Sequence, residues 1–217
     1  MNLKGGKPER FGSVTSFLYR RWGEPSLAPL HRRIVSEIPA ADGRMLDVGC
    51  GPGQLDRLLA RAHPRLTVVG LDGSPAMIRQ AMRGAQIPNL HFREGTIEEA
   101  GFREEFEFAL SVLSFHHWEE PVEGLDAVER ALKPNGQFWI YEADPEASIE
   151  EIHRDEAPLW GWLRLPEKLV RRGLSGHGFT LAEVDRVLRP VIARSSFRTC
   201  DVHRTGSTLR IALTKAP

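Results

Sequence analysis

Residues 45–55 read Met-Leu-Asp-Val-Gly-Cys-Gly-Pro-Gly-Gln-Leu, and this stretch decides the fold. A short apolar run ends in three glycines, Gly49, Gly51 and Gly53, and a helical pattern of leucines follows. This order predicts a strand, a tight turn and the start of a helix. Glycine in such a turn permits positive φ and lets a ligand approach the backbone closely. Units of this kind bind nucleotide-like cofactors in doubly wound sheets.

The residues after this stretch alternate between strand and helix patterns. The near-continuous apolar run 66–72 is typical of a buried parallel strand, and Ser74-Pro75 is typical of a helix start. Such alternation favours a parallel sheet with right-handed crossovers. We therefore predict an α/β fold: a doubly wound, Rossmann-like, seven-stranded sheet in three αβα layers, mostly parallel with an antiparallel last strand. After the first strand, the predicted strands are 66–72, 90–94, 106–113, 137–142, 196–203 and 208–214, and the main predicted helices are 54–62, 75–83, 121–132 and 180–188.

The length of 217 residues fits one α/β domain, so we expect a single domain over 1–217. Two segments lie outside the alternating pattern. Residues 1–40 precede the first strand and contain two helical patterns, Ser13–Trp22 and Leu27–Ile38. Residues 148–173 are helical in pattern at the point where the next strand would be expected.

Charge and cysteine content exclude several classes of protein. Lys plus Arg and Asp plus Glu both total 29, so the formal net charge of zero gives no reason to expect nucleic acid or a membrane as a partner. The two cysteines, Cys50 and Cys200, are too few for a disulfide framework or a zinc site, and we expect no metal. Neither a signal peptide nor a membrane-spanning apolar run is visible, so we expect a cytoplasmic protein.

The glycine turn departs from the pattern that binds dinucleotides. A G-x-G-x-x-G pattern that starts at Gly49 requires its third glycine at position 54, which is Gln54, and Pro52 removes a backbone N–H from the loop. Both features disfavour a pyrophosphate and therefore a nucleotide-dependent oxidoreductase. Asp72 ends the next strand about twenty residues later, where a carboxylate accepts hydrogen bonds from ribose hydroxyls. A ribose without a pyrophosphate indicates a nucleoside-type ligand.

Four motifs resemble those of one enzyme family. Residues 46–53, Leu-Asp-Val-Gly-Cys-Gly-Pro-Gly, resemble the first motif of the class I S-adenosylmethionine-dependent methyltransferases, and residues 69–77 resemble the second. Residues 111–118 and the turn 132–136 resemble the later motifs. The resemblance is strongest to small, single-domain enzymes, and it implies S-adenosylmethionine as cofactor and methyl transfer to a small-molecule acceptor by in-line displacement. The alternative is a non-catalytic protein that binds S-adenosylmethionine or S-adenosylhomocysteine.

The resemblance also implies a set of cofactor-binding residues at the ends of the strands. The glycines would lie beneath methionine and ribose, Asp47 would orient the loop or meet the amino group, and Asp72 would hold the ribose. Thr96 and Ile97 would lie beside the adenine. The full set is Asp47, Gly49, Gly51, Gly53, Asp72, Gly73, Met77, Thr96, Ile97, Leu113 and Ser114, of which the last two would lie near the sulfonium.

Two of these positions depart from the family pattern. Thr96 stands where the family often has an Asp that accepts from the adenine amino group. Gly73 replaces the usual apolar residue packed on adenine, and Met77 is the candidate to fill that space. These departures predict measurable but modest affinity for the cofactor.

His116 and His117 follow the fourth strand, at the edge where open α/β sheets bind ligands. One of them is our candidate general base, because histidine titrates near neutral pH. The other interpretation is that one of them caps the next helix or bonds the backbone. Methyl transfer requires a base only where the acceptor must lose a proton.

The acceptor side has weaker candidates. In related enzymes N-terminal helices often fold over the cofactor and the insertion after the fifth strand builds the acceptor pocket, which would make 1–40 a lid and 148–173 a wall of that pocket. The candidate substrate-side residues are Tyr19, Trp118, Glu142 and Trp160. The alternatives are simple packing for the three aromatic residues and an exposed or salt-bridged role for Glu142.

Overall fold

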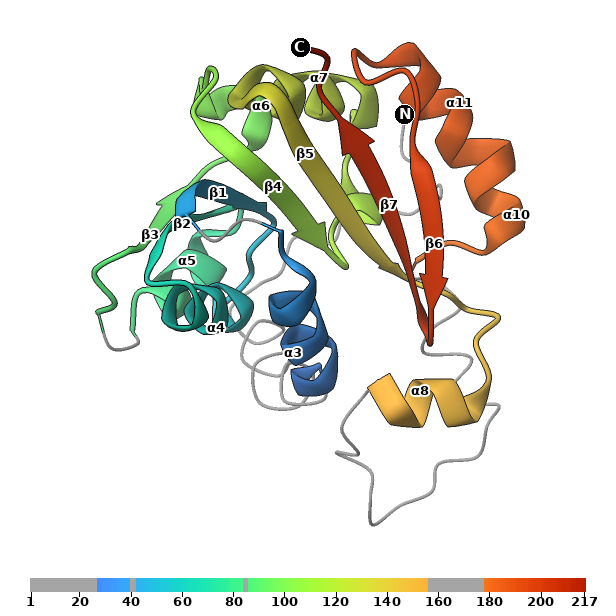
Figure 1. Ribbon diagram of the computed structural model, residues 1–217, viewed down its shortest axis with the longest axis horizontal. Coiled ribbons are helices and arrows are strands. Elements are labelled where there is room, and N and C mark those ends of the chain that lie inside the picture. Colours follow the sequence, from blue (N-terminus) through green and yellow to red (C-terminus); the bar gives the residue numbers. More distant parts are fainter. Residues whose placement is uncertain (1–26, 40–41, 84–85, 156–177) are drawn as a thin grey trace.

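The computed structural model describes residues 27–39, 42–83, 86–155 and 178–217, in which a twisted sheet forms the centre (Figure 1). Its strands are β1 (Asp42–Val48), β2 (Arg65–Asp72), β3 (Leu90–Glu94), β4 (Phe106–Val112), β5 (Leu132–Ala143), β6 (Asp201–Thr205) and β7 (Thr208–Thr214). Within the described residues the seven strands have the order β3-β2-β1-β4-β5-β7-β6. β7 runs antiparallel to both its neighbours, and the remaining pairs are parallel. The predicted fold class is therefore confirmed.

Helices lie on both faces of the sheet, and several begin at the capping residues that the sequence predicts. The side chain of Ser74 accepts from the N–H of Met77, and Pro75 follows it in the first turn. Thr180 and Glu183 form a reciprocal capping box. The helices are α3 (Ala28–Glu37), α4 (Gln54–Ala62), α5 (Pro75–Ala81), α6 (Ile97–Ala100), the 3₁₀ turn η2 (Phe115–His117), α7 (Pro121–Ala131), α8 (Ile149–Asp155), α10 (Leu181–Glu183), the π-helical η3 (Val184–Leu188) and α11 (Arg189–Arg194).

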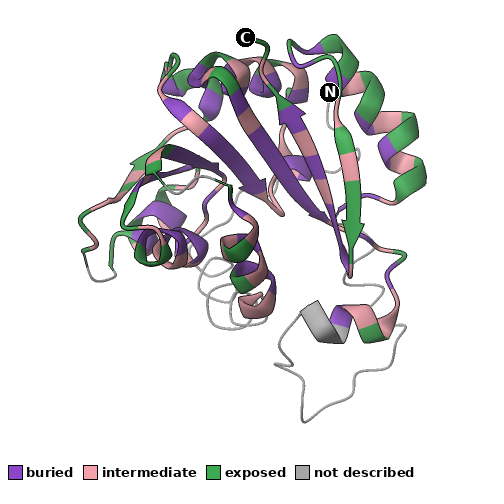
Figure 2. Cartoon of the chain, in the orientation of Figure 1, coloured by how far each residue is buried: buried purple, intermediate pink, exposed green. Residues whose placement is uncertain are grey.

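Alternate residues of the central strands belong to two hydrophobic clusters, one on each face of the sheet. Leu46, Ala109 and Ile140 pack in one cluster with residues of α6, α7, η3 and α11. Met45 and Phe108 pack in the other with residues of α3 and α4. A sheet covered on both faces buries every side chain of its central strands, which is why these strands read as continuous apolar runs. Figure 2 shows the buried central strands and the exposed outer sides of the helices.

Three boundaries differ most from the sequence prediction. The helix predicted to end at Leu188 continues to Arg194, because Pro190 falls in the first turn of α11 after a π-helical turn and is tolerated there. The strand predicted over 196–203 begins later, at Asp201, since Arg198 has a φ of +66° that an extended strand excludes. The turn 132–136 lies inside β5 as an irregularity of the ladder, where Asn135 has a φ of +63°.

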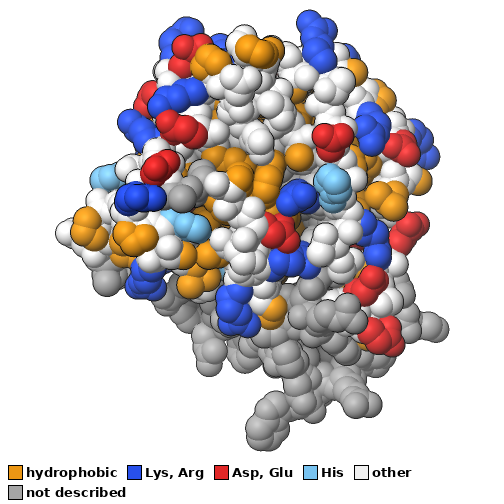
Figure 3. Space-filling view, in the orientation of Figure 1, with side chains coloured by type: hydrophobic (Ala, Val, Ile, Leu, Met, Phe, Trp, Pro, Cys, Tyr) orange, Lys and Arg blue, Asp and Glu red, His pale blue; other side chains and the backbone are white. Residues whose placement is uncertain are grey.

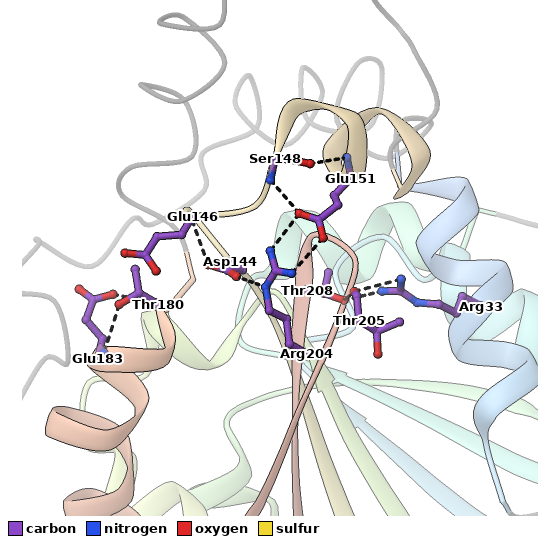
Figure 4. Close-up of polar contacts among 10 residues, drawn as sticks. All are labelled: Arg33, Asp144, Glu146, Ser148, Glu151, Thr180, Glu183, Arg204, Thr205 and Thr208. Carbon is purple, nitrogen blue, oxygen red and sulfur yellow. Dashed lines mark hydrogen bonds and ion pairs between the residues drawn. The ribbon is translucent and has the colours of Figure 1, made fainter.

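The tip of the β6–β7 hairpin is tied to α3 and α8 by two arginines (Figure 4). Arg204 donates to Asp144 at 2.6 Å and to both oxygens of Glu151 in α8, at 2.9 and 3.0 Å. Arg33 of α3 donates to the carbonyl of Thr205 at 3.2 Å. The hydrogen bonds from Arg204 lower the pKa of Glu151 to about 2. Two segments far apart in the sequence are thus fixed to the same end of the sheet.

The surface carries mixed charge. On the face drawn in Figure 3, Lys and Arg side chains alternate with Asp and Glu, and hydrophobic side chains are exposed between them. This pattern agrees with the formal net charge of zero and forms no single-sign field on this face. Within the described residues, no helix is both long enough and apolar enough to cross a membrane.

Candidate functional site

The glycine turn has a backbone that glycine adopts without strain. Gly49, Gly51 and Gly53 have φ values of +84°, +55° and +75°. A Cβ on Gly49 would lie 1.9 Å from Ser114 Oγ, and one on Gly53 would lie 2.4 Å from the ring of Phe92. A Cβ on Gly51 would meet nothing within 4 Å. Packing therefore requires the first and third glycines, whereas the second leaves open space in which a ligand can approach the backbone.

Asp72, at the end of β2, holds the turn in place. Its carboxylate accepts from the N–H of Gly51 at 2.9 Å and from the N–H of Ser74 at 2.8 Å, one on each oxygen. Burial raises the pKa of Asp72, and these two hydrogen bonds oppose the rise. Each oxygen retains acceptor capacity, which the predicted contact with ribose hydroxyls requires.

Two further carboxyl groups, those of Asp47 in β1 and Asp56 in α4, are buried near the turn. Their side chains are buried, and in the described part of the chain Asp47 Oδ1 and both oxygens of Asp56 have no hydrogen-bond partner. Burial, and then the carboxyls of Asp56 and Asp72, raises the pKa of Asp47 well above its usual range; burial raises the pKa of Asp56 to about 7. Asp56 was not among the residues predicted from the sequence, although its spacing from the buried Leu59 and Ala60 is that of one helix face.

On the predicted adenine side, the two residues that depart from the family pattern, Gly73 and Thr96, lie close together. A Cβ on Gly73 would lie 3.8 Å from Thr96 Cγ2, and both residues are exposed. Thr96 stands at the N-cap of α6, where its side chain makes no capping hydrogen bond. Met77 and Ile97 are buried, so little of their surface is available to a base stacked there.

The end of β4 approaches the glycine turn. Leu113 has a φ of +52° and its N–H donates to the carbonyl of Tyr141 in β5 at 2.8 Å. The next residue, Ser114, occupies the space that a side chain on Gly49 would need. Ser114, one of the two residues predicted near the sulfonium, therefore lies against the turn predicted to bind the donor.

The loop after β4 is the 3₁₀ turn η2, in which His116 pairs with Glu142 at the end of β5. His116 Nδ1 lies 2.8 Å from Glu142 Oε2, and its backbone N–H donates to Glu142 Oε1 at 3.0 Å. Both side chains are buried. The rings of His116 and His117 have centroids 3.9 Å apart, and His117 is the more exposed residue. The carboxylate fixes both the backbone and the ring of His116.

Known proteins place this arrangement in a family. Residues 46–140 match the family model described as a methyltransferase domain. An uncharacterized methyltransferase of Mycobacterium bovis is 33% identical over 165 residues, which are 72% of this chain and 64% of that protein. Residues 46–140 are therefore a methyltransferase domain, and the fold is that of the class I S-adenosylmethionine-dependent methyltransferases.

A second relative and a solved structure are also similar to the methyltransferase. A fatty-acid O-methyltransferase of Mycolicibacterium smegmatis is 32% identical over 133 residues, which are 60% of this chain and 48% of that protein. A crystal structure from Methanococcus maripaludis, of an S-adenosyl-L-methionine-dependent methyltransferase by its description, has a TM-score of 0.75 at 16% identity and covers 98% of this chain and 97% of that one. The structural likeness shows the fold. The methyltransferase matches less than two thirds of the length of either curated relative.

The turn fits the cofactor of this family, S-adenosylmethionine. Gly51 leaves open space beside the backbone, Asp72 keeps acceptor capacity, and Asp47 has a carboxyl oxygen without a partner in the described residues. These are the groups that a nucleoside carrying an amino acid requires. Within the described residues, no cluster of His, Cys, Asp and Glu side chains is arranged to hold a metal ion.

The remaining acceptor-side candidates divide into two groups. Trp118 packs against Phe115 and Phe138, with ring centroids 4.9 and 6.3 Å away, and over Gly124, so most of its surface belongs to the core. Tyr19 and Trp160 lie outside the described residues. The sequence left the role of Glu142 open, and the structure pairs it with His116.

Proposed function

We propose that this methyltransferase transfers a methyl group from S-adenosylmethionine to a small-molecule acceptor, and that His116 takes up the acceptor's proton. The observation that carries the proposal is the contact between the donor-binding turn and the end of β4, where Gly49 meets Ser114. This contact brings the turn to within two residues of His116 along the chain. The named fatty-acid O-methyltransferase supports a small acceptor that is methylated on oxygen.

The chain's own groups hold the donor. The glycine turn, Asp47 and Asp72 would bind methionine and ribose, and Leu113 and Ser114 would border the methyl group. S-adenosylmethionine, when bound, supplies a methyl group that is already activated by its positive sulfur. Positioning of the two reactants therefore accounts for much of the rate, and the chain needs no nucleophile of its own.

His116 is the base in this proposal, and Glu142 is its positioning residue. The Nδ1–H of a neutral His116 donates to Glu142, which leaves the ring's lone pair on Nε2. An acceptor hydroxyl gives its proton to Nε2, and Glu142 stabilises the resulting imidazolium. The second hydrogen bond, from the backbone N–H of His116, holds the Glu142 carboxylate beside the ring.

The test uses the full chain with methyl-deuterated S-adenosylmethionine and a panel of hydroxylated and carboxylic small molecules. Mass spectrometry detects S-adenosylhomocysteine and the labelled product. With a hydroxyl acceptor, we expect His116→Ala to lower kcat by roughly 10²- to 10⁴-fold, with unchanged affinity for S-adenosylmethionine. His117→Ala is the matched control, and we expect less than about a tenfold loss. Equal losses in the two variants would contradict the role of His116 as base.

The second candidate function is non-catalytic binding of the cofactor or its product, which the exposed pair Gly73 and Thr96 favours. Binding of S-adenosylmethionine without product from any acceptor in the panel supports this candidate. If calorimetry detects no binding of either nucleoside at millimolar concentration, both functions are excluded.

A further inference from the structure

Asp56 is a buried carboxyl group for which the proposed reaction has no use. It lies in the first turn of α4, behind the glycine turn, and its side chain is 0% exposed. Neither of its oxygens has a hydrogen-bond partner within the described residues. First-turn acids commonly stabilise a helix from the solvent side, where water continues to solvate them. A carboxylate withdrawn from water without a partner instead costs several kcal/mol, which calls for another explanation.

Among the described residues, burial raises the pKa of Asp56 to about 7; its own backbone N–H and the charge of Arg57 oppose the rise, and the carboxyl of Asp72 adds to it. Asp47 from β1 and Asp72 from β2 are both acids, and their carboxyls and that of Asp56 together raise the pKa of the Cys50 thiol, after burial itself. The neighbouring cation, Arg57, donates instead to the carbonyls of Pro52, Gly53 and Ala81.

In the part of the chain that the structure describes, the other elements packed against α4 add no further cation beside Asp56. From α3, burial lowers the pKa of His31 to about 4, so its ring is neutral near neutral pH. From β3, the side chain that reaches the start of α4 is the apolar ring of Phe92. The glycine turn thus has three acids beside it, and Asp47 and Asp56 contribute oxygens without partners.

We propose that Asp56 acts with Asp47 to favour the sulfonium form of the cofactor over its neutral thioether product. The inference rests on the proposed use of S-adenosylmethionine as donor. The proposed donor is an organic cation, and its positive charge complements the buried acids beside the turn, whose oxygens lack partners among the described residues. S-adenosylmethionine carries a positive sulfur that S-adenosylhomocysteine lacks, and both carry the same amino and carboxylate groups. A nearby negative charge in a poorly solvated site therefore strengthens binding of the first more than binding of the second, and it promotes release of the product after transfer.

Calorimetry of the full chain with each nucleoside tests this proposal at about pH 5.5 and about pH 7.5, on either side of the range in which a buried acid of this kind titrates. We expect the preference of the wild-type chain for S-adenosylmethionine to increase with pH. In Asp56→Asn, we expect this preference to fall roughly five- to tenfold at the higher pH, while affinity for S-adenosylhomocysteine changes less than about twofold. Asp185→Asn is the matched control, because it removes an exposed carboxylate from another helical segment and should change neither affinity.

Each outcome separates the inference from the proposed function. If the wild-type chain binds neither nucleoside, the proposed function fails. If it binds both, and Asp56→Asn weakens both equally or weakens neither, the role of Asp56 is contradicted and the function stands. Circular dichroism checks the folding of each variant, and Asp56→Thr replaces Asp56→Asn if the latter does not fold. A wild-type preference that is the same at both pH values contradicts the proposal whatever the variants do.

Discussion

The buried carboxyl groups on the two sides of the site differ in their hydrogen bonding. On the donor side, Asp47 and Asp56 have oxygens that no donor in the described residues reaches. On the acceptor side, Glu142 is just as buried, yet both its oxygens accept hydrogen bonds from His116. An unpaired buried carboxylate destabilises the free protein until a cation binds, whereas a paired one stiffens its surroundings. Under the proposed function, the donor side depends on its ligand for completion, whereas the acceptor side holds its base in position beforehand.

The largest effect is expected where the two sides touch, at Gly49. In Gly49→Ala, the new Cβ would lie 2.6 Å from Ser114 Cβ, and alanine would have to adopt a φ of +84°. We expect the free energy of unfolding to fall by about 3 kcal/mol or more in urea denaturation without ligand. Gly51→Ala is the control: it has space for the methyl group, should lose only about 1 kcal/mol, and should weaken S-adenosylmethionine binding at least about tenfold. Equal stability of the two variants would contradict the contact.

The second largest effect is expected on the acceptor side, at Glu142. Glu142→Gln keeps the shape of the side chain but replaces one of its two accepting oxygens with an NH₂ donor. This donor would then face one of the two groups of His116 that donate to Glu142. We expect a loss of about 2 kcal/mol in the free energy of unfolding, without ligand. Glu146→Gln, at an exposed position four residues later, serves as the control and should be neutral. A neutral result for Glu142→Gln would show that the acceptor side is not held by this pair.

On the donor side, Asp56 should make the free energy of unfolding depend on pH. Its pKa in the folded chain, about 7, lies above its ordinary value of 3.8, so the folded state binds the proton more tightly than the unfolded state. The stability of the ligand-free wild-type chain should therefore decrease as the pH rises from about 4 through 7. In Asp56→Asn this decrease should be smaller, which would make the variant more stable than wild type by about 1–2 kcal/mol near pH 8. If urea denaturation shows the same dependence of the free energy of unfolding on pH in wild type and variant, Asp56 does not carry an unpaired charge in the folded protein.

The smallest effect is expected at the hairpin tip, which borders the acceptor side. Arg204→Lys retains the charge but loses the two parallel hydrogen bonds to Glu151. We expect amide hydrogen exchange in α8 to become roughly two- to fivefold faster, with little change in global stability. Arg189→Lys, in an exposed i,i+4 pair with Asp185, should leave α8 unchanged. If both substitutions leave exchange in α8 unchanged, Arg204 does not hold this helix.

The sequence predicts the sheet because its signals are local. Continuous apolar runs mark strands that are covered on both faces, and the glycine turn marks the first crossover. The helix end at Leu188 and the strand start at Ser196 were wrong, because a π-helical turn and the left-handed Arg198 are set by tertiary packing. Such conformations leave no periodic pattern in the chain.

The neighbours of the glycine turn were easier to predict than those of His116 for a similar reason. Asp47, the three glycines and Asp72 lie on one strand, one turn and the end of the next strand, so their spacing in the sequence already fixes which of them are neighbours. The pair of His116 and Glu142 depends on how far β4 and β5 each extend at the same edge, which spacing does not reveal. Asp56 was missed because an acid in the first turn of a helix is ordinarily exposed.

The ties from the hairpin tip also set an order of assembly. Arg33 reaches a residue 172 positions away, and Arg204 reaches one 53 positions away, whereas β1 and β2 pair across a single crossover. Contacts that close long loops form late, since the entropy of closure must be overcome first. As the chain emerges during synthesis, the strands that carry the glycine turn can therefore pair before β6 and β7 exist. The turn predicted to bind the methyl donor is thus in place before the hairpin tip is tied to α3 and α8.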